Sequence, residues 1–185
     1  RGSFSPTSSP GAMTTPATPT PVDMSHPSRW LAALRVAYGF WFFKALWTKL
    51  EFTLLAGFIP FLQVQQRWID TMPTIVMKQM AENPITWYKT FVEANVLANV
   101  PLFASLTAWG EALVGISLVV GLFAGLGALG ALYLSCMYAL ATWHMSPSAQ
   151  GFHYLLICTA ITLFLARAGK AWGLDGWIAW RWPGS

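Results

Sequence analysis

The chain has 185 residues, of which 55% are hydrophobic and only 10% are charged. A composition this apolar is atypical of a soluble globular domain and favours helices that lie in lipid, where each helix satisfies its own backbone. The formal net charge is +4, but the basic residues are scattered beside apolar runs. They form no cluster of the kind that binds nucleic acid, so nucleic acid is excluded as a partner.

Residues 1–28 form a tail rich in Ser, Thr and Pro. Such a composition cannot bury enough apolar area to offset the entropy lost on ordering. A segment of this kind becomes ordered against another molecule. We therefore expect the tail to contact other subunits of a larger assembly.

The first membrane-spanning helix is predicted from Trp30 to about Phe58. It is the least regular span, because four charged residues interrupt it: Arg35, Lys44, Lys49 and Glu51. Pro60 and the polar run that follows end it. Further on, prolines at Pro73 and Pro84 are expected to break the chain again.

Residues 63–98 are amphipathic and predict a helical insert that lies outside the membrane, at its interface. Within the insert, Lys89 and Glu93 lie opposite a row of apolar side chains with helical spacing. This row consists of Ile85, Tyr88, Val92 and Val96.

Three further apolar runs predict spans from Pro101 to Phe123, from Leu126 to Trp143 and from Phe152 to Ala166. Together with the first, they predict an all-α fold: a polytopic membrane four-helix bundle over residues 29–170. A glycine-rich link joins the second and third spans, so these two should be antiparallel and closely packed. The glycines expected at the packed faces are Gly115, Gly121 and Gly125.

Residues 171–185 hold four tryptophans and predict a tail anchored at the membrane interface. Four spans place both termini on the same side of the membrane. More Lys and Arg collect beside the termini than at the other side, which favours termini in the cytoplasm.

Glu111 lies ten residues into the second span, which at ~1.5 Å per residue is ~15 Å deep, near the centre of the bilayer. A carboxylate there is usually paired, protonated or functional. We expect a structural ion pair with a cation of the first span. By depth Lys44 is a better partner than Lys49, and Arg35 is a third candidate. A role of Glu111, Lys44 and Lys49 in proton or quinone chemistry stays open.

His144 and His153 bracket the loop between the third and fourth spans. They are candidate ligands of a haem or a pigment, or they form hydrogen bonds where water is available. Cys136 and Cys158 have no partner at metal-binding spacing, and no metal-binding motif occurs in the sequence. The sequence therefore assigns no metal and no catalytic activity to the chain on its own.

Three segments resemble the DoxX and DoxD group of small bacterial and archaeal membrane proteins. Within the first span, the segment from Arg35 to the pair Lys49 and Leu50 resembles the family's helix, which starts with Arg and closes in Lys-Leu. The second carries Glu-x-x-x-Gly-x-x-Leu-x-x-Gly from Glu111 to Gly121. The chain after the fourth span carries Gly-Leu-Asp at 173–175.

The resemblance implies an accessory subunit of a larger respiratory or photosynthetic electron-transfer complex in a bacterial or archaeal cytoplasmic membrane. The alternative it implies is the small subunit of a thiosulfate:quinone oxidoreductase, with Glu111 and Lys44 or Lys49 near a quinone or proton path. On either reading the partners are membrane lipids and other subunits, contacted through the N-terminal tail and the Trp-rich C-terminus. A quinone, a lipid or a pigment could lie at these interfaces.

Overall fold

A computed structural model describes residues 26–55 and 58–181, which are mostly helical. The N-terminal tail up to residue 25 and Trp182 lie outside the described residues. The long helices are α1 (His26–Phe43), α3 (Gln66–Met80), α5 (Val100–Val120), α6 (Ala124–Thr142) and α7 (Pro147–Leu165). The shorter elements are α2 (Ala45–Thr48), β1 (Leu50–Leu55), β2 (Ile59–Val64), α4 (Thr86–Phe91) and α8 (Leu174–Arg181). A π-helical turn (Val92–Val96) and three 3-10 turns (Leu97–Asn99, Trp143–Met145 and Ala168–Lys170) complete the chain.

Among the described residues, three helical stretches are long and apolar enough to cross a membrane. They are Thr86–Val120, Ala124–Met145 and Pro147–Leu165. These stretches overlap the second, third and fourth predicted spans, with the first stretch ending at Val120 instead of Phe123 and the last at Leu165 instead of Ala166, so the chain has the helices of a membrane protein. The helix α1 is not among them.

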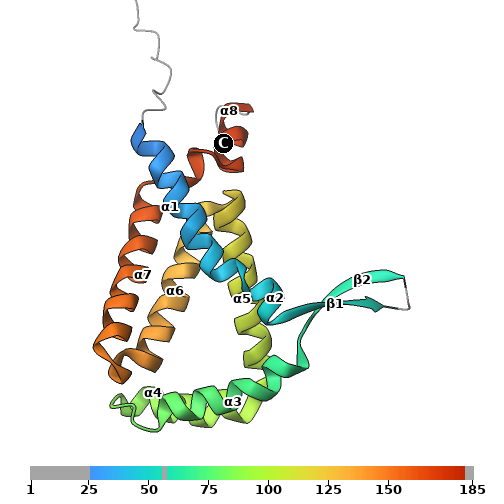
Figure 1. The fold of residues 1–185 in the computed structure, drawn as a ribbon, viewed down its shortest axis with the longest axis vertical. Coiled ribbons are helices and arrows are strands. Elements are labelled where there is room, and N and C mark those ends of the chain that lie inside the picture. The colour runs from blue at the N-terminus through green and yellow to red at the C-terminus, as the bar shows by residue number, and fades with distance from the viewer. Residues whose placement is uncertain (1–25, 56–57, 182–185) are drawn as a thin grey trace, which may run out of the picture.

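The helix α1 packs lengthwise against α5, and α5, α6 and α7 follow one another side by side (Figure 1). Two glycines allow α1 and α5 to pack closely against each other. A Cβ on Gly39 would lie 2.7 Å from that of Leu118, and a Cβ on Gly115 would overlap the backbone of Phe43. Gly115 is thus a packing glycine, as predicted. Gly125 is not, because a Cβ there would meet no atom within 4 Å.

The strands β1 and β2 pair antiparallel as a β-hairpin, which corrects the prediction of a helix up to Phe58. Here Leu50, Phe52 and Leu54 alternate with Glu51 and Thr53, and this period of two is that of a strand. The register places Glu51 opposite Gln63, whose amide donates a 3.0 Å hydrogen bond to its carboxylate. The alternation is hard to recognise in the sequence, because these residues continue the apolar run that precedes them.

The helices α3 and α4 lie across one end of the long helices (Figure 1). Tyr88, Val92 and Val96 are buried there against Met72 and Met80 of α3, so these three members of the apolar row share one buried face. The predicted start of the insert is wrong, because residues 63 and 64 belong to β2. Its second half continues directly into the long stretch that ends at residue 120.

The prolines of the insert act differently from each other. Pro73 lies inside α3 and does not break it, contrary to the prediction. The break comes around Pro84, where the side chain of Asn83 bridges two segments. Its amide donates a 2.8 Å hydrogen bond to the carbonyl oxygen of Leu140, and its own oxygen accepts one from the amide of Ile85.

Arg35 closes the opposite end of the helices. It is fully buried, and its guanidinium donates to the carbonyl oxygens of Ala168, Ala171 and Trp172 at 2.8 to 3.2 Å. Arg35 therefore holds the turn after α7, which corrects its prediction as an ion-pair partner of Glu111.

The link between α5 and α6 lies against this turn. Gly121 ends α5 in the left-handed conformation, with φ of 71°. A Cβ on Gly121 would lie 2.6 Å from the guanidinium of Arg35 and from the backbone of Gly173. Gly121 is therefore both the end of a helix and a point of close packing.

Candidate functional site

Glu111, in the middle of α5, is the centre of a buried polar cluster. One carboxylate oxygen lies 2.7 Å from the ammonium of Lys49, and the other accepts a hydrogen bond from the hydroxyl of Tyr138 on α6. Only 14% of the Lys49 side chain and 9% of the Glu111 side chain are exposed. The predicted ion pair is present, and Tyr138 is a third member that sequence reasoning missed.

Lys49, and not Lys44, is the partner of Glu111, which corrects the order expected from depth. The depth argument assumed one straight helix through residue 49, whereas α2 ends at Thr48 and the chain then turns into β1. This turn brings Lys49 back toward α5. Lys44 instead lies over the ring of Trp41, with 3.4 Å from its ammonium to the ring centroid.

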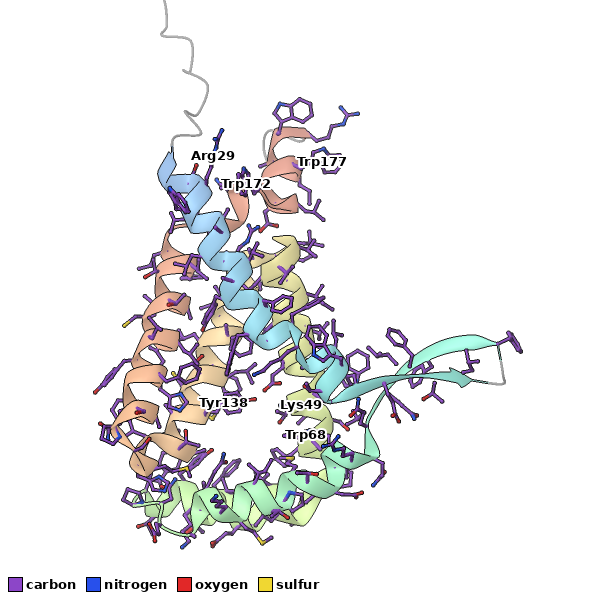
Figure 2. The ribbon with its side chains drawn as sticks, in the orientation of Figure 1. Arg29, Lys49, Trp68, Tyr138, Trp172 and Trp177 are labelled. Atoms are coloured by element: carbon purple, nitrogen blue, oxygen red, sulfur yellow. The ribbon has the colours of Figure 1, made fainter. Side chains whose placement is uncertain are left out.

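Trp68 of α3 forms one wall of the site. Its indole nitrogen donates a 3.1 Å hydrogen bond to the carbonyl oxygen of Ala104, and its ring lies 4.1 Å from the ammonium of Lys49. The face of the ring attracts the Lys49 ammonium, and Glu111 neutralises the charge of that ammonium. Figure 2 shows Lys49, Trp68 and Tyr138 in one region of the molecule, near α3.

The cluster opens into a cavity of about 550 Å³. Aromatic side chains form part of its wall. Polar groups converge on it from α2, α3, α5, α6 and α7, and from Lys49 between α2 and β1. Its lining includes Trp41, Lys44, Lys49, Trp68, Glu111, Tyr138, Thr142, Phe152 and His153. A cavity of this size with apolar walls and a few polar groups is the usual form of a small-molecule site.

His153 lines the same cavity, and the hydrogen bonds around it assign its tautomer. The hydroxyl of Thr142 donates its one proton to the carbonyl oxygen of Tyr138, and its oxygen lies 2.6 Å from Nε2 of His153. With the Thr142 proton directed to Tyr138, it is Nε2 that carries the proton and donates to Thr142. The buried Nδ1 is then an acceptor that has no hydrogen-bond partner among the described residues.

His144 lies apart from this arrangement, in the 3-10 turn after α6. In the part of the chain that the structure describes, no hydrogen bond or ring contact joins the two histidines. Within the same residues, no group of three His, Cys, Asp or Glu side chains is placed to hold a metal ion. The paired-histidine haem site considered from the sequence gains no support from this geometry.

The arrangement has the parts needed to bind an amphipathic molecule and to exchange protons with it. Glu111 and Tyr138 form a short path for a proton, Lys49 fixes the carboxylate, and His153 offers a free acceptor. Sequence reasoning found Glu111, Lys49 and His153 but missed the roles of Thr142 and Tyr138. No protein-family model and no solved structure matches this chain.

Proposed function

We propose that this chain is a DoxX-like accessory subunit of a larger membrane electron-transfer complex, in which α1 is a fourth span beside the three apolar stretches. The observation that carries the proposal is the hairpin of β1 and β2, which projects sideways from the long helices (Figure 1).

The hairpin leaves the helices at the level of the middle of α5. Its first residue, Leu50, is buried against Ala108 and Ala112. These two alanines are ~12 to 18 Å along the axis from the start of α5, at ~1.5 Å per residue. Because the hydrocarbon core is about 30 Å thick, this level is close to its centre.

Open strand edges are not stable in lipid, because no water is present to bond the free backbone groups. In the described residues the sheet has two strands only, so each strand has one unpaired edge. Large apolar side chains also extend from both faces, with Phe52 80% and Phe61 52% exposed. A second membrane protein that covers these edges supplies the missing backbone partners.

The test is to purify the chain from its native membrane in mild detergent, and to measure the mass of the particle and its redox-cofactor absorbance. The variant F52S/F61S is compared with L126S/L155S, which changes two equally exposed side chains on α6 and α7. We expect the hairpin variant alone to lose the partner and its cofactor absorbance. Recovery of the unchanged chain as a particle without a redox partner would overturn the proposal.

A second function is favoured by the cavity beside Glu111: the small membrane subunit of a thiosulfate:quinone oxidoreductase. Aromatic walls suit a quinone ring. The Glu111 carboxylate, in contact with the Tyr138 hydroxyl, and the free acceptor on His153 suit the protons that accompany quinone reduction.

Thiosulfate-dependent reduction of a short-chain quinone by the purified complex tests this function. General acid–base groups contribute at least about a hundredfold, so E111Q should reduce the rate by about that factor. The control E93Q changes an exposed carboxylate outside the hairpin and outside the cavity, and should leave the rate unchanged. An intact complex without thiosulfate-dependent activity excludes this function and leaves the accessory role standing.

A further inference from the structure

A second cavity, of about 680 Å³, lies at the end of the molecule that Arg35 closes. It is formed between the start of α6, the end of α7 and α8. One part of its wall is apolar and includes Phe123, Phe164, Leu165 and Ile178. The rest carries two cationic side chains, Arg167 and Lys170.

Both cations are exposed and unpaired. Among the described residues, the ion pair of Lys49 and Glu111 is the only one, and neither Arg167 nor Lys170 forms another. The carboxylate in the cavity wall, Asp175, is already engaged. It accepts hydrogen bonds of 2.8 and 2.9 Å from the backbone amides of Phe123 and Ala124 at the start of α6.

The backbone that carries the two cations is held in place. Arg167 ends α7 in the left-handed conformation, with φ of 47°, which is unusual for a residue with a side chain. The guanidinium of Arg35 then binds three carbonyl oxygens of the following turn. Close contact of Gly169 with Asp175 fixes this turn against α6. The positions of Arg167 and Lys170 are therefore set before any ligand binds.

The surroundings of the cavity are those of a membrane interface. Trp30, Trp172, Trp177 and Trp180 are all exposed at this end, and Figure 2 shows Arg29, Trp172 and Trp177 together there. Exposed tryptophans mark the level of lipid headgroups. Basic residues at that level attract anionic lipids.

We propose that this cavity binds an anionic phospholipid. Its phosphate lies between Arg167 and Lys170, which donate charge-assisted hydrogen bonds to the phosphate oxygens. One acyl chain lies along Phe123, Phe164 and Leu165, beside α6 and α7. This site is at the far end from the Glu111 cavity and does not depend on the function proposed there.

The test is to delipidate the purified chain in detergent and to measure its melting temperature with added phosphatidylglycerol, phosphatidylcholine or inorganic phosphate. We expect phosphatidylglycerol to raise the melting temperature and the other two to leave it unchanged. An equal effect of phosphatidylcholine, or of phosphate alone, overturns the proposal.

The variant R167Q/K170Q removes the proposed contacts. Each basic residue near an anionic lipid contributes about fivefold, so the apparent affinity for phosphatidylglycerol should fall about thirtyfold. The matched control R67Q/K78Q removes one Arg and one Lys, both exposed on α3 at the other end, and should bind as the unchanged chain does. Equal losses in both variants would show that the effect is general charge attraction and would overturn the site.

A cavity-filling variant keeps the test decisive if R167Q/K170Q does not fold. Gly125 lines the cavity, and a Cβ there meets no atom within 4 Å, so G125L is sterically tolerated. It keeps both cations but occupies the space of the acyl chain. We expect the melting temperature of G125L without lipid to be unchanged or higher, and its response to phosphatidylglycerol to be lost. A retained response overturns the proposal.

Discussion

The polar cluster around Glu111 is costly to leave incomplete, because its charges are buried. Glu111 and Lys49 neutralise one another, and the Tyr138 hydroxyl satisfies the second carboxylate oxygen. Removing one member of a buried ion pair leaves an uncompensated charge, whereas removing both leaves none. The two kinds of change therefore have different effects on stability.

We expect K49M to lower the free energy of unfolding by about 3 to 5 kcal/mol. The double variant K49M/E111L should recover much of this loss, because no charge is then buried. Unfolding by denaturing detergent, followed by far-UV circular dichroism, measures both values.

Lys44 provides the control for this prediction. It contacts the ring of Trp41 and forms no ion pair with Glu111 in the described structure. A contact of this kind contributes about 0.5 to 2 kcal/mol, more as the cation is removed from water. Because Lys44 is half-buried, K44M should cost no more than about 2 kcal/mol, less than K49M. A loss from K44M as large as that from K49M would contradict the assignment of Lys49 as the partner.

At the scale of elements, the sequence was informative where one strong pattern was present and misleading where two competed. The spans predicted to start at Pro101 and Leu126 match α5 and α6 within a few residues, because long apolar runs with at most one charge have one interpretation. The fourth helix starts earlier than predicted, at Pro147, where Ser146 caps it. The hairpin was missed because its residues are apolar enough to extend the helix before it.

The candidate site could be predicted only in part, for a similar reason. Glu111 was identified because a carboxylate in an apolar run is conspicuous. The roles of Tyr138 and Trp68 depend on which helix faces meet, and a single sequence does not specify that. The sequence ranks Lys49 below Lys44 because the place of Lys49 depends on the helix ending at Thr48, which the apolar run does not indicate.

The contact between α1 and α5 depends on Gly115. In G115A the new Cβ overlaps the backbone of Phe43, so the two helices must separate, at a cost of about 1 to 3 kcal/mol. The same change at Gly110, on the same helix, meets no atom within 4 Å. G110A should therefore be neutral, or stabilise α5 by about 0.5 to 1 kcal/mol. Melting temperatures of the two variants in detergent compare them directly, and equal values would contradict this packing.

At the scale of the whole molecule, the two cavities occupy different places along the long helices. The Glu111 cavity lies toward α3, whereas the second cavity lies at the end that carries Arg35 and α8. Between them the core is made mainly of small and aliphatic side chains, such as Leu118, Ala128 and Ala160. The two sites can therefore be altered separately, and the variants proposed for one are controls for the other.

The hydrogen bonds of Arg35 also set an order on the synthesis of this protein. Their acceptors lie 133 to 137 residues further along the chain. While the ribosome is still making α5 and α6, the guanidinium has none of these acceptors. The contacts that hold α1 in its described place can therefore form only after residue 172 has been made.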